Sequence, residues 1–139
     1  MSIEENKQIV RRYQECYNSN NLNGLDEVIA FEVVMPKIMP DMPSGLEGAK
    51  QVHRTTLLGM PDFRTEILDL FAEGDRVAAR VLMTGTHTGN FYGIPATGKR
   101  VEFTGMYIVR IENGKIVEHW GEEDSLSLLK QLGYVVKPV

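Results

Sequence analysis

The spacing of apolar residues changes from helical in the first half of the chain to alternating in the second half. Ser2 followed by Glu5 is a capping-box pattern, and apolar residues recur three or four positions apart after it, which predicts an amphipathic helix over residues 3–18. A polar turn follows, and the apolar positions in residues 25–29 predict a short second helix. The chain is therefore expected to begin with helical structure.

Residues 33–43 keep neither period, because charged residues and prolines interrupt the apolar positions. We predict an irregular segment there, with room for one short strand. After it, Ser44 and Glu47 form a second capping-box pattern, which predicts a third helix that ends near Gly59.

The second half of the chain has the period of two that is typical of strands with one buried face. A loop rich in glycine, threonine and proline, residues 88–98, divides it, and Asn113-Gly114 is a strong signal for a two-residue hairpin turn. A short helix is expected from Ser125 to Gly133. The predicted strands are residues 63–71, 76–87, 99–112 and 116–121. Together these elements predict one α+β domain over residues 1–139, with helices on one face of a curved antiparallel sheet.

The hairpin turn determines which residues of its two strands oppose each other. A regular register places Val109 opposite Glu118 and Tyr107 opposite Trp120, and directly opposed residues share a face. We therefore expect Phe103, Tyr107 and Trp120 to form one apolar wall, with Glu118 embedded in it.

Two histidines take different places in this arrangement. His119 is expected on the face opposite the apolar wall, whereas the parity of its strand puts His87 on the apolar side. A β-bulge in either strand would shift these assignments, and Gly105 is a candidate position for one.

Composition and charge argue against several classes of protein. The chain has 42% apolar and 24% charged residues, as ordinary globular proteins do, and its net charge of −4 includes no basic stripe for nucleic acid or an anionic membrane surface. No apolar run approaches the roughly 20 residues of a membrane span, and no signal peptide is evident. Cys16 is the only cysteine, which favours a reducing cytoplasm as the location.

The strand that contains Trp120 runs into a cluster of carboxylates, and Asp124 is the last of them. Asp124 has two interpretations. As the N-cap of the following helix, its carboxylate accepts hydrogen bonds from backbone amides, and a carboxylate held in this way is a poor acid. If the side chain points instead into an apolar cavity, desolvation makes it a usable acid and base.

Other residues also have a structural interpretation beside the functional one. His87 could bind a ligand carbonyl or pair with Asp124, or it could be a strand-end histidine bonded to the backbone. Trp120 and Tyr107 can fill the core, line a cavity or do both, and Glu118 can form a salt bridge or act as a second acid/base group. No pair of histidines has the spacing of a zinc site, so we predict no metal.

Several short motifs occur in a fixed order along the chain. They are Pro61-Asp62-Phe63, Gly74-Asp75-Arg76-Val77, Gly85-Thr86-His87-Thr88-Gly89, Gly93-Ile94-Pro95-Ala96-Thr97-Gly98 and Gly114-Lys115-Ile116-Val117-Glu118-His119-Trp120, followed by Asp124 and Gln131-Leu132-Gly133. With this series the chain resembles the SnoaL-like polyketide cyclase (ester cyclase) family over nearly its whole length, most firmly over residues 60–133.

The resemblance implies the cone-shaped α+β barrel of the nuclear transport factor 2-like superfamily, in which a curved sheet wraps around N-terminal helices and encloses a deep apolar pocket. Members commonly form dimers or tetramers, so a homo-oligomer is expected. In characterised members an aspartate at the position of Asp124 is the acid/base of an intramolecular aldol condensation, and that chemistry needs no cofactor. The expected ligand is a small apolar or aromatic molecule.

On this basis Asp124 and His87 are the predicted catalytic residues. The predicted substrate-binding residues are Trp120, Tyr107, Phe103, Glu118 and Tyr17. The main hypothesis is a cofactor-independent enzyme, a cyclase or a related isomerase, that works by proton transfer. The alternatives are a binding module that holds a small apolar ligand without turnover, and a structural or oligomerisation domain.

Overall fold

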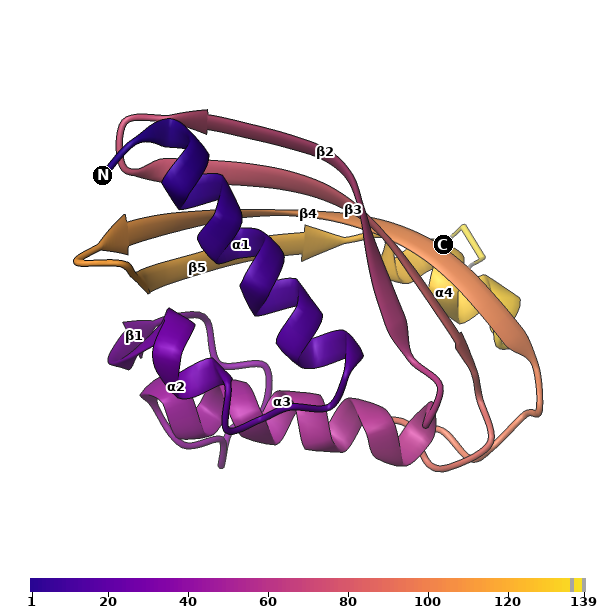
Figure 1. Cartoon of the computed structure of the whole chain (residues 1–139). Helices are drawn as coiled ribbons and strands as arrows, with labels where there is room; N and C mark the ends of the chain where they lie inside the picture. The colour runs from indigo at the N-terminus through magenta and orange to yellow at the C-terminus, as the bar shows by residue number, and fades with distance from the viewer. Residues whose placement is uncertain (136, 139) are drawn as a thin grey trace.

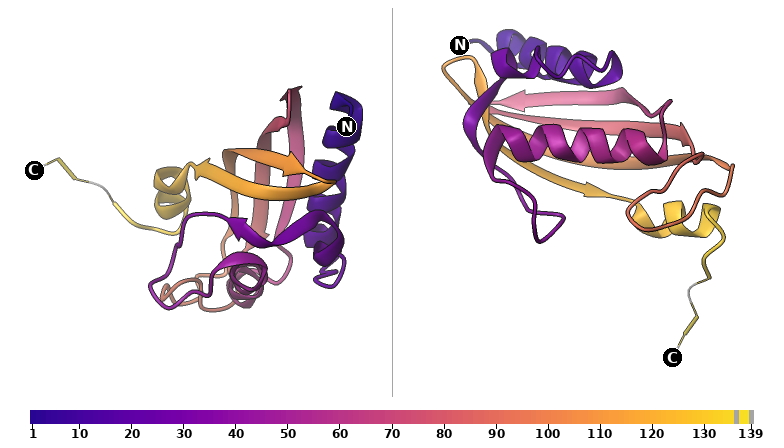
Figure 2. Two further views of the ribbon diagram at one scale, coloured as in Figure 1. Left: turned by 90° about the vertical axis from the view of Figure 1, so that its left-hand side faces the viewer. Right: turned by 90° about the horizontal axis from the view of Figure 1, so that it is seen from below.

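The computed structural model describes residues 1–135 and 137–138 of the chain. Five strands form one curved, open sheet in the order β1-β5-β4-β3-β2, and helices α1 and α3 lie on its concave side (Figure 1 and Figure 2). The elements are α1 (Ile3–Asn18), α2 (Leu25–Val28), β1 (Ile29–Val34), α3 (Gly45–Gly59), β2 (Arg64–Glu73), β3 (Arg76–Thr86), β4 (Arg100–Glu112), β5 (Lys115–Glu123) and α4 (Ser125–Gln131). The predicted α+β class is confirmed, and none of the described helices is both long and apolar enough to span a bilayer.

Helix α1 has the bounds that the sequence predicted, and its capping box is present. The Ser2 hydroxyl accepts a hydrogen bond from the Glu5 amide at 3.1 Å, and the Glu5 carboxylate accepts one from the Ser2 amide at 3.3 Å. Ile9, Val10 and Tyr13 form a buried stripe along the side of the helix that faces the sheet. Helix α1 therefore closes one side of the concave face.

Helix α3 lies where the third helix was predicted, but the capping box predicted at Ser44 and Glu47 is wrong. The Ser44 side chain makes no capping hydrogen bond. Gly45 adopts a left-handed conformation with φ +69°, and a Cβ on it would overlap the carbonyl oxygen of Phe31 in β1. The first residue of α3 thus packs closely against β1, and the helix begins without the predicted side-chain cap.

Strand β1 is the main departure from the predicted sheet. It begins at Ile29, directly after the one-turn helix α2, so most of it precedes the irregular segment in which a strand was expected. It runs parallel to β5, whereas all other neighbouring strands are antiparallel. The sheet is therefore mixed, because an apolar pattern marks a strand but does not specify the direction of its partner.

Buried residues of strand β4 alternate with exposed or half-buried ones along its whole length, as its pattern predicted. Its buried side chains, Phe103, Tyr107 and Val109 among them, form part of one apolar cluster with α1 and β3. This cluster occupies the concave side of the sheet, and any internal site must be built from the same face.

The pairing of β4 with β5 contains a β-bulge that the predicted register lacks. The two strands pair as predicted from the turn up to Ile116, but the next pair joins Arg110 to Glu118, so Val117 is an extra residue in β5. A shift of one residue moves every later side chain to the other face of the sheet. The predicted faces of β5 beyond Ile116 are therefore wrong, and Trp120 lies on the exposed side.

Candidate functional site

The bulge turns His119 and Glu123 toward the concave face of the sheet. His119 pairs with Val109, Glu123 pairs with Gly105, and both of these β4 residues belong to the buried side of their strand. Gly121 lies between them in the strand and pairs with Tyr107, and a Cβ on it would contact the ring of His119 at 3.4 Å. The inner face of β5 thus presents one imidazole and one carboxylate to the interior.

His119 belongs to a group of aromatic and imidazole rings that connects the sheet with α1 and α3. Its ring stacks on that of Tyr107 with a centroid separation of 5.0 Å, and Tyr107 meets Tyr13 edge-on at 5.9 Å. Tyr13 meets Tyr17 at 4.9 Å, and the ring of Tyr17 lies 4.6 Å from that of His53 on α3. We call these five residues the tyrosine–histidine cluster.

Burial keeps the tyrosine–histidine cluster neutral. It raises the pKa of Tyr13, Tyr17 and Tyr107 above the ordinary value of a tyrosine, and it lowers the pKa of His119 to about 4. The Tyr107 hydroxyl donates a hydrogen bond to Oε1 of Gln14 at 3.1 Å. Near neutral pH the cluster therefore offers hydrogen bonds and ring surface without charge.

His53 has a buried ring nitrogen, Nε2, for which the described part of the chain provides no hydrogen-bond partner. The residue is only 5% exposed, and burial lowers its pKa. An unpaired buried polar atom is unfavourable, so a ligand atom that bonds to it would be stabilised. Among the described residues no group of His, Cys, Asp and Glu side chains is arranged to hold a metal ion.

The two carboxylates at the junction of β5 and α4 have different surroundings. Partial burial of the carboxyl group raises the pKa of Glu123, although the residue as a whole is exposed at the edge of the concave face. Asp124 is exposed and is the N-cap of α4, since its Oδ1 accepts a hydrogen bond from the Ser127 amide at 3.0 Å. Of the two orientations considered for Asp124, the structure shows the helix cap. Its catalytic role stays a prediction.

His87 lies fully buried just after β3, on the apolar side that the parity of its strand predicted. Its Nδ1 is 3.0 Å from the Thr97 hydroxyl, and its Nε2 is 3.2 Å from the carbonyl oxygen of Ile94. Both ring nitrogens therefore have partners within the loop over residues 88–98. This geometry favours the structural interpretation of His87, in which the ring holds the loop together.

Trp120 and Glu118 lie on the convex face and not in the predicted apolar wall, because the bulge reverses their direction. Trp120 is 45% exposed, and the Glu118 carboxylate forms an ion pair with Arg110 and accepts a hydrogen bond from Nε1 of Trp120 at 3.1 Å. The wall keeps its members from β4 and has His119 in place of Trp120. The other predicted substrate-binding residues, Phe103, Tyr107 and Tyr17, pack in or against the interior apolar cluster.

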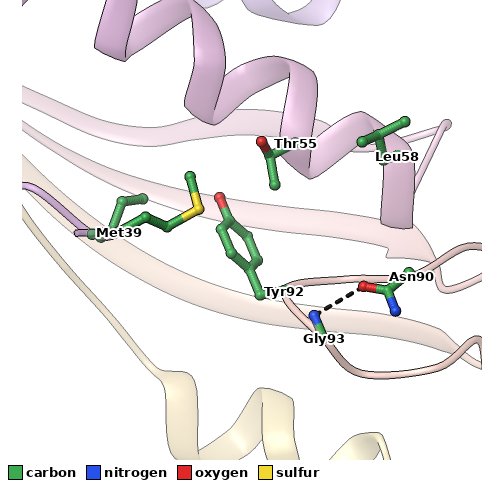
Figure 3. Close-up of a pocket in the computed structure, with 7 residues that line it drawn as sticks. Met39, Thr55, Leu58, Asn90, Tyr92 and Gly93 are labelled. Atoms are coloured by element: carbon green, nitrogen blue, oxygen red, sulfur yellow. Dashed lines mark hydrogen bonds between the residues drawn. The ribbon is translucent and has the colours of Figure 1, made fainter. Parts of the chain in front are cut away.

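A cavity of about 690 Å³ opens beside α3, where the segment after β1 and the loop over residues 88–98 approach the helix (Figure 3). It is open to solvent, unlike the deep pocket that was expected. The residues that line it are Ile38, Met39, Thr55, Leu58, Asn90, Tyr92 and Gly93. Neither His119 nor Glu123 on the inner face of β5 belongs to this lining.

Sequence reasoning missed three residues of this arrangement, for two reasons. His119 was assigned to the wrong face and Glu123 was not singled out, because no residue pattern marks the bulge before them. Tyr92 lies in an irregular loop at φ +48°, where no periodic pattern indicates the direction of a side chain.

Comparisons with known proteins find the same kind of relative by sequence and by fold. A family model described as SnoaL-like polyketide cyclase matches residues 7–132. Aklanonic acid methyl ester cyclase DnrD of Streptomyces peucetius is 31% identical over 128 residues, which cover 90% of this chain and 88% of that protein. Nogalonic acid methyl ester cyclase of Streptomyces nogalater is 33% identical over 120 residues, covering 85% of this chain and 90% of that protein. The solved structure of TsrD from Streptomyces laurentii is similar at a TM-score of 0.89 and 30% identity, covering 97% of this chain and 99% of that one.

Proposed function

The chain belongs to the SnoaL-like polyketide cyclase family, and from this premise we propose that it closes a ring of a polyketide by an intramolecular aldol-type condensation. The observation that carries the proposal is the position of Glu123, a carboxylate on the concave face whose pKa is raised by burial. Such a carboxylate is a stronger base than an ordinary one, and it holds its proton up to a higher pH. The proposed reaction therefore proceeds by proton transfer, without a cofactor.

The reaction begins when the Glu123 carboxylate removes a proton from a carbon that is flanked by carbonyl groups. The resulting carbanion attacks another carbonyl carbon of the same molecule, so that a carbon–carbon bond forms and an alkoxide develops on that carbonyl oxygen. Glu123 then returns its proton to the alkoxide, which regenerates the carboxylate and leaves a product that is an isomer of the substrate. Alignment of the reacting carbons supplies part of the rate, since effective molarities of aligned intramolecular reactions reach on the order of 10⁵ M or more.

The tyrosine–histidine cluster supports the binding of an uncharged aromatic substrate. Tyr17, Tyr107 and Phe103 are the proposed substrate-binding residues, because their rings provide stacking surface on the interior side. Nε2 of His53 adds a hydrogen-bonding group that lacks a partner within the described residues. The described residues that line the cavity beside α3 are all uncharged, which suits a neutral ligand, and Glu123 lies outside this lining.

Incubation of the purified protein with aklanonic acid methyl ester and with nogalonic acid methyl ester tests the proposed reaction. We expect at least one ester to be converted, faster than in buffer alone, into a ring-closed product of unchanged mass that chromatography separates from the substrate. In deuterium oxide the activated carbon should also exchange its proton. Binding of the esters, seen as a thermal shift, without conversion or exchange would instead favour the non-catalytic binding module.

We also propose that the protein is a homodimer that associates through the convex face of the sheet. The strand register aligns Phe71, Ala78, Ile108 and Trp120 in one row across β2, β3, β4 and β5. Phe71 is 69% exposed, and Ile108 and Trp120 are each 45% exposed. With strands about 4.8 Å apart, this apolar row is about 15 Å long. A contiguous apolar surface of this kind is typical of an interface, and a twofold axis would cover both copies at once.

Replacing Ile108 by glutamate is expected to convert the dimer into a monomer, because it places a charge in the middle of the apolar row. Sedimentation velocity or light scattering coupled to size exclusion measures the mass of the assembly. Leu58→Glu is a matched control, since Leu58 is exposed on α3, on the other side of the sheet. A wild-type protein that is already monomeric, or an Ile108 variant that stays dimeric, would contradict this interface.

A further inference from the structure

The second half of β5 has a neighbouring strand on one side only (Figure 1). Strand β1 lies beside the first half, and its last pair with β5 joins Val34 to Glu118. Pro36 follows two positions after Val34 and has no N–H group with which the pairing could continue. Among the described residues no strand lies beside residues 119–123 on the side away from β4. We call this side of residues 119–123 the free edge of β5.

The backbone groups of Gly121 and Glu123 point toward the free edge. The Asp124 amide donates a hydrogen bond to the Thr104 carbonyl next to β5 in β4, at 2.9 Å. Hydrogen-bonded and non-hydrogen-bonded pairs alternate along an antiparallel ladder, and the pairing of β4 with β5 is regular after the bulge. The N–H and C=O groups of Gly121 and Glu123 therefore point away from β4, and they have no backbone partner among the described residues.

The same two residues also belong to the concave face of the sheet. Glu123 pairs with Gly105 and Gly121 pairs with Tyr107, both on the buried side of β4, and Gly121 and Glu123 are themselves exposed. Two residues of a strand span about 7 Å, a separation that a glutamate side chain and a carbonyl-bearing carbon can bridge together. The Glu123 carboxylate and the Gly121 amide therefore serve one corner, where the concave face meets the free edge.

Neither the backbone nor the packing of β5 requires a glycine at position 121. The φ angle of Gly121 is not positive, so other residues can adopt its conformation. A Cβ on it would lie 3.4 Å from the His119 ring and 3.5 Å from Cβ of Tyr107, which are van der Waals distances. Glycine weakens the interior of a strand, and it often marks a place where a ligand approaches the backbone closely. The absence of a side chain leaves the Gly121 amide open to approach from the concave side.

The length of the free edge favours a small molecule over a peptide strand as its ligand. Beyond His119, only Gly121 and Glu123 present backbone groups there before α4 begins at Ser125. Strands in folded proteins commonly have five or six residues, so this stretch is too short to pair with one. A carbonyl oxygen needs only one N–H donor, and a carboxylate that can act on the neighbouring carbon lies at the same corner.

We propose that the Gly121 N–H binds the oxygen of the carbonyl group next to the carbon that Glu123 deprotonates. This inference rests on the proposed function and adds the donor that stabilises its first intermediate. When Glu123 takes the proton, the electron pair left on the carbon is delocalised onto this oxygen as an enolate. The carbon then attacks the second carbonyl group, and the enolate oxygen becomes a carbonyl oxygen again. Gly121 loses no proton, and its amide, fixed in the sheet, requires no reorganisation as the charge develops.

Replacement of Gly121 by glycolic acid tests the inference, because it exchanges the backbone N–H for an oxygen atom and changes no side chain. Nonsense suppression in cell-free translation introduces the residue. With the ester that the wild type converts best, we expect kcat to fall by about 10²- to 10³-fold, as for the loss of one oxyanion donor, while KM stays close to the wild-type value. Glycolic acid in place of Gly74, in the turn between β2 and β3, is the matched control and should leave kcat unchanged.

Glu123→Gln, measured in parallel, separates the two proposals. Wild-type kcat with glycolic acid at position 121, beside an inactive Glu123→Gln protein, would overturn the role of Gly121 and leave the proposed function intact. Full activity of both proteins would overturn the proposed function itself.

A second readout does not depend on turnover. Labelling with ¹⁵N-glycine gives amide signals for the 13 glycines, and the signal that disappears in Gly121→Ala belongs to Gly121. With 2-acetylnaphthalene as an aromatic ketone probe at millimolar concentration, the Gly121 amide proton should move downfield while that of Gly74 stays in place. A Gly121 signal that does not move would contradict the proposed hydrogen bond.

Discussion

Replacing Glu123 by glutamine is expected to lower kcat by about 10²- to 10⁴-fold, because a positioned acid/base group contributes a factor of that size. Glutamine has nearly the shape of glutamate but cannot accept the proton. Glu123 is the last residue of β5 and lies at the edge of the concave face, so the fold should tolerate the change. Turnover of the preferred ester and the melting temperature, measured on the same preparation, check both parts of this expectation.

Asp124→Asn is the matched control, because the two carboxylates are neighbours in the chain. Asparagine caps a helix about as well as aspartate, so the hydrogen bond to the Ser127 amide can be kept while the charge is removed. We expect the activity of this variant to stay close to that of the wild type. Activity lost in Asp124→Asn and kept in Glu123→Gln would assign the proton transfer to Asp124, the residue that the family resemblance indicates.

The pH dependence of the activity provides an independent check on Glu123. The carboxylate acts as a base only when it is ionised, and burial raises its pKa above 4.5. Activity should therefore fall on acidification at a higher pH than an ordinary glutamate would cause. An acid limb at or below the ordinary value would contradict a role for this residue.

Acidification is also expected to destabilise the fold through His119, whose pKa burial lowers from 6.5 to about 4. Between these values the unfolded chain binds a proton that the folded protein does not bind. The contribution of His119 to the free energy of unfolding is therefore complete above pH 6.5 and is lost as the pH falls toward 4. At about 1.4 kcal/mol for each pKa unit, the loss approaches about 3 kcal/mol.

Urea unfolding at a series of pH values measures this loss, and His119→Phe isolates it. Phenylalanine keeps a ring against Tyr107 and Tyr13 but cannot titrate. His53 and the carboxylates also respond to pH, but they are present in both proteins and cancel in the comparison. The wild type should lose more stability than the variant between pH 6.5 and 4, and equal losses would show that His119 is not buried as a neutral ring.

Periodicity and local signals were sufficient for most of the fold. The capping box at Ser2 and the hairpin signal at Asn113-Gly114 are local features whose energetics depend on a few neighbouring atoms, and both elements lie where they were predicted. The parallel partner of β1 and the approach of Gly45 to that strand depend on residues far apart in the chain. Such long-range contacts leave no periodic pattern in the sequence.

The candidate site was predictable only where its residues belong to a regular strand or helix. Tyr107 and Phe103 lie on the predicted face because β4 alternates without interruption. Trp120 does not lie there, because an extra residue in β5 changes the parity of everything after it. The bulge requires no glycine, and Gly105, the residue considered for it, is regularly paired in the neighbouring strand.

Either of two sets of β5 side chains could face the concave side of the sheet, and the extra residue at Val117 decides which set does so. In one register the strand would offer an indole and the carboxylate of Glu118, and in the other it offers His119 and Glu123. Deletion or insertion of a single residue between the turn and Glu118 would exchange these sets completely. In this chain, a change in length of one position near the hairpin would thus alter the side chains on the concave face more than a substitution within β5 would.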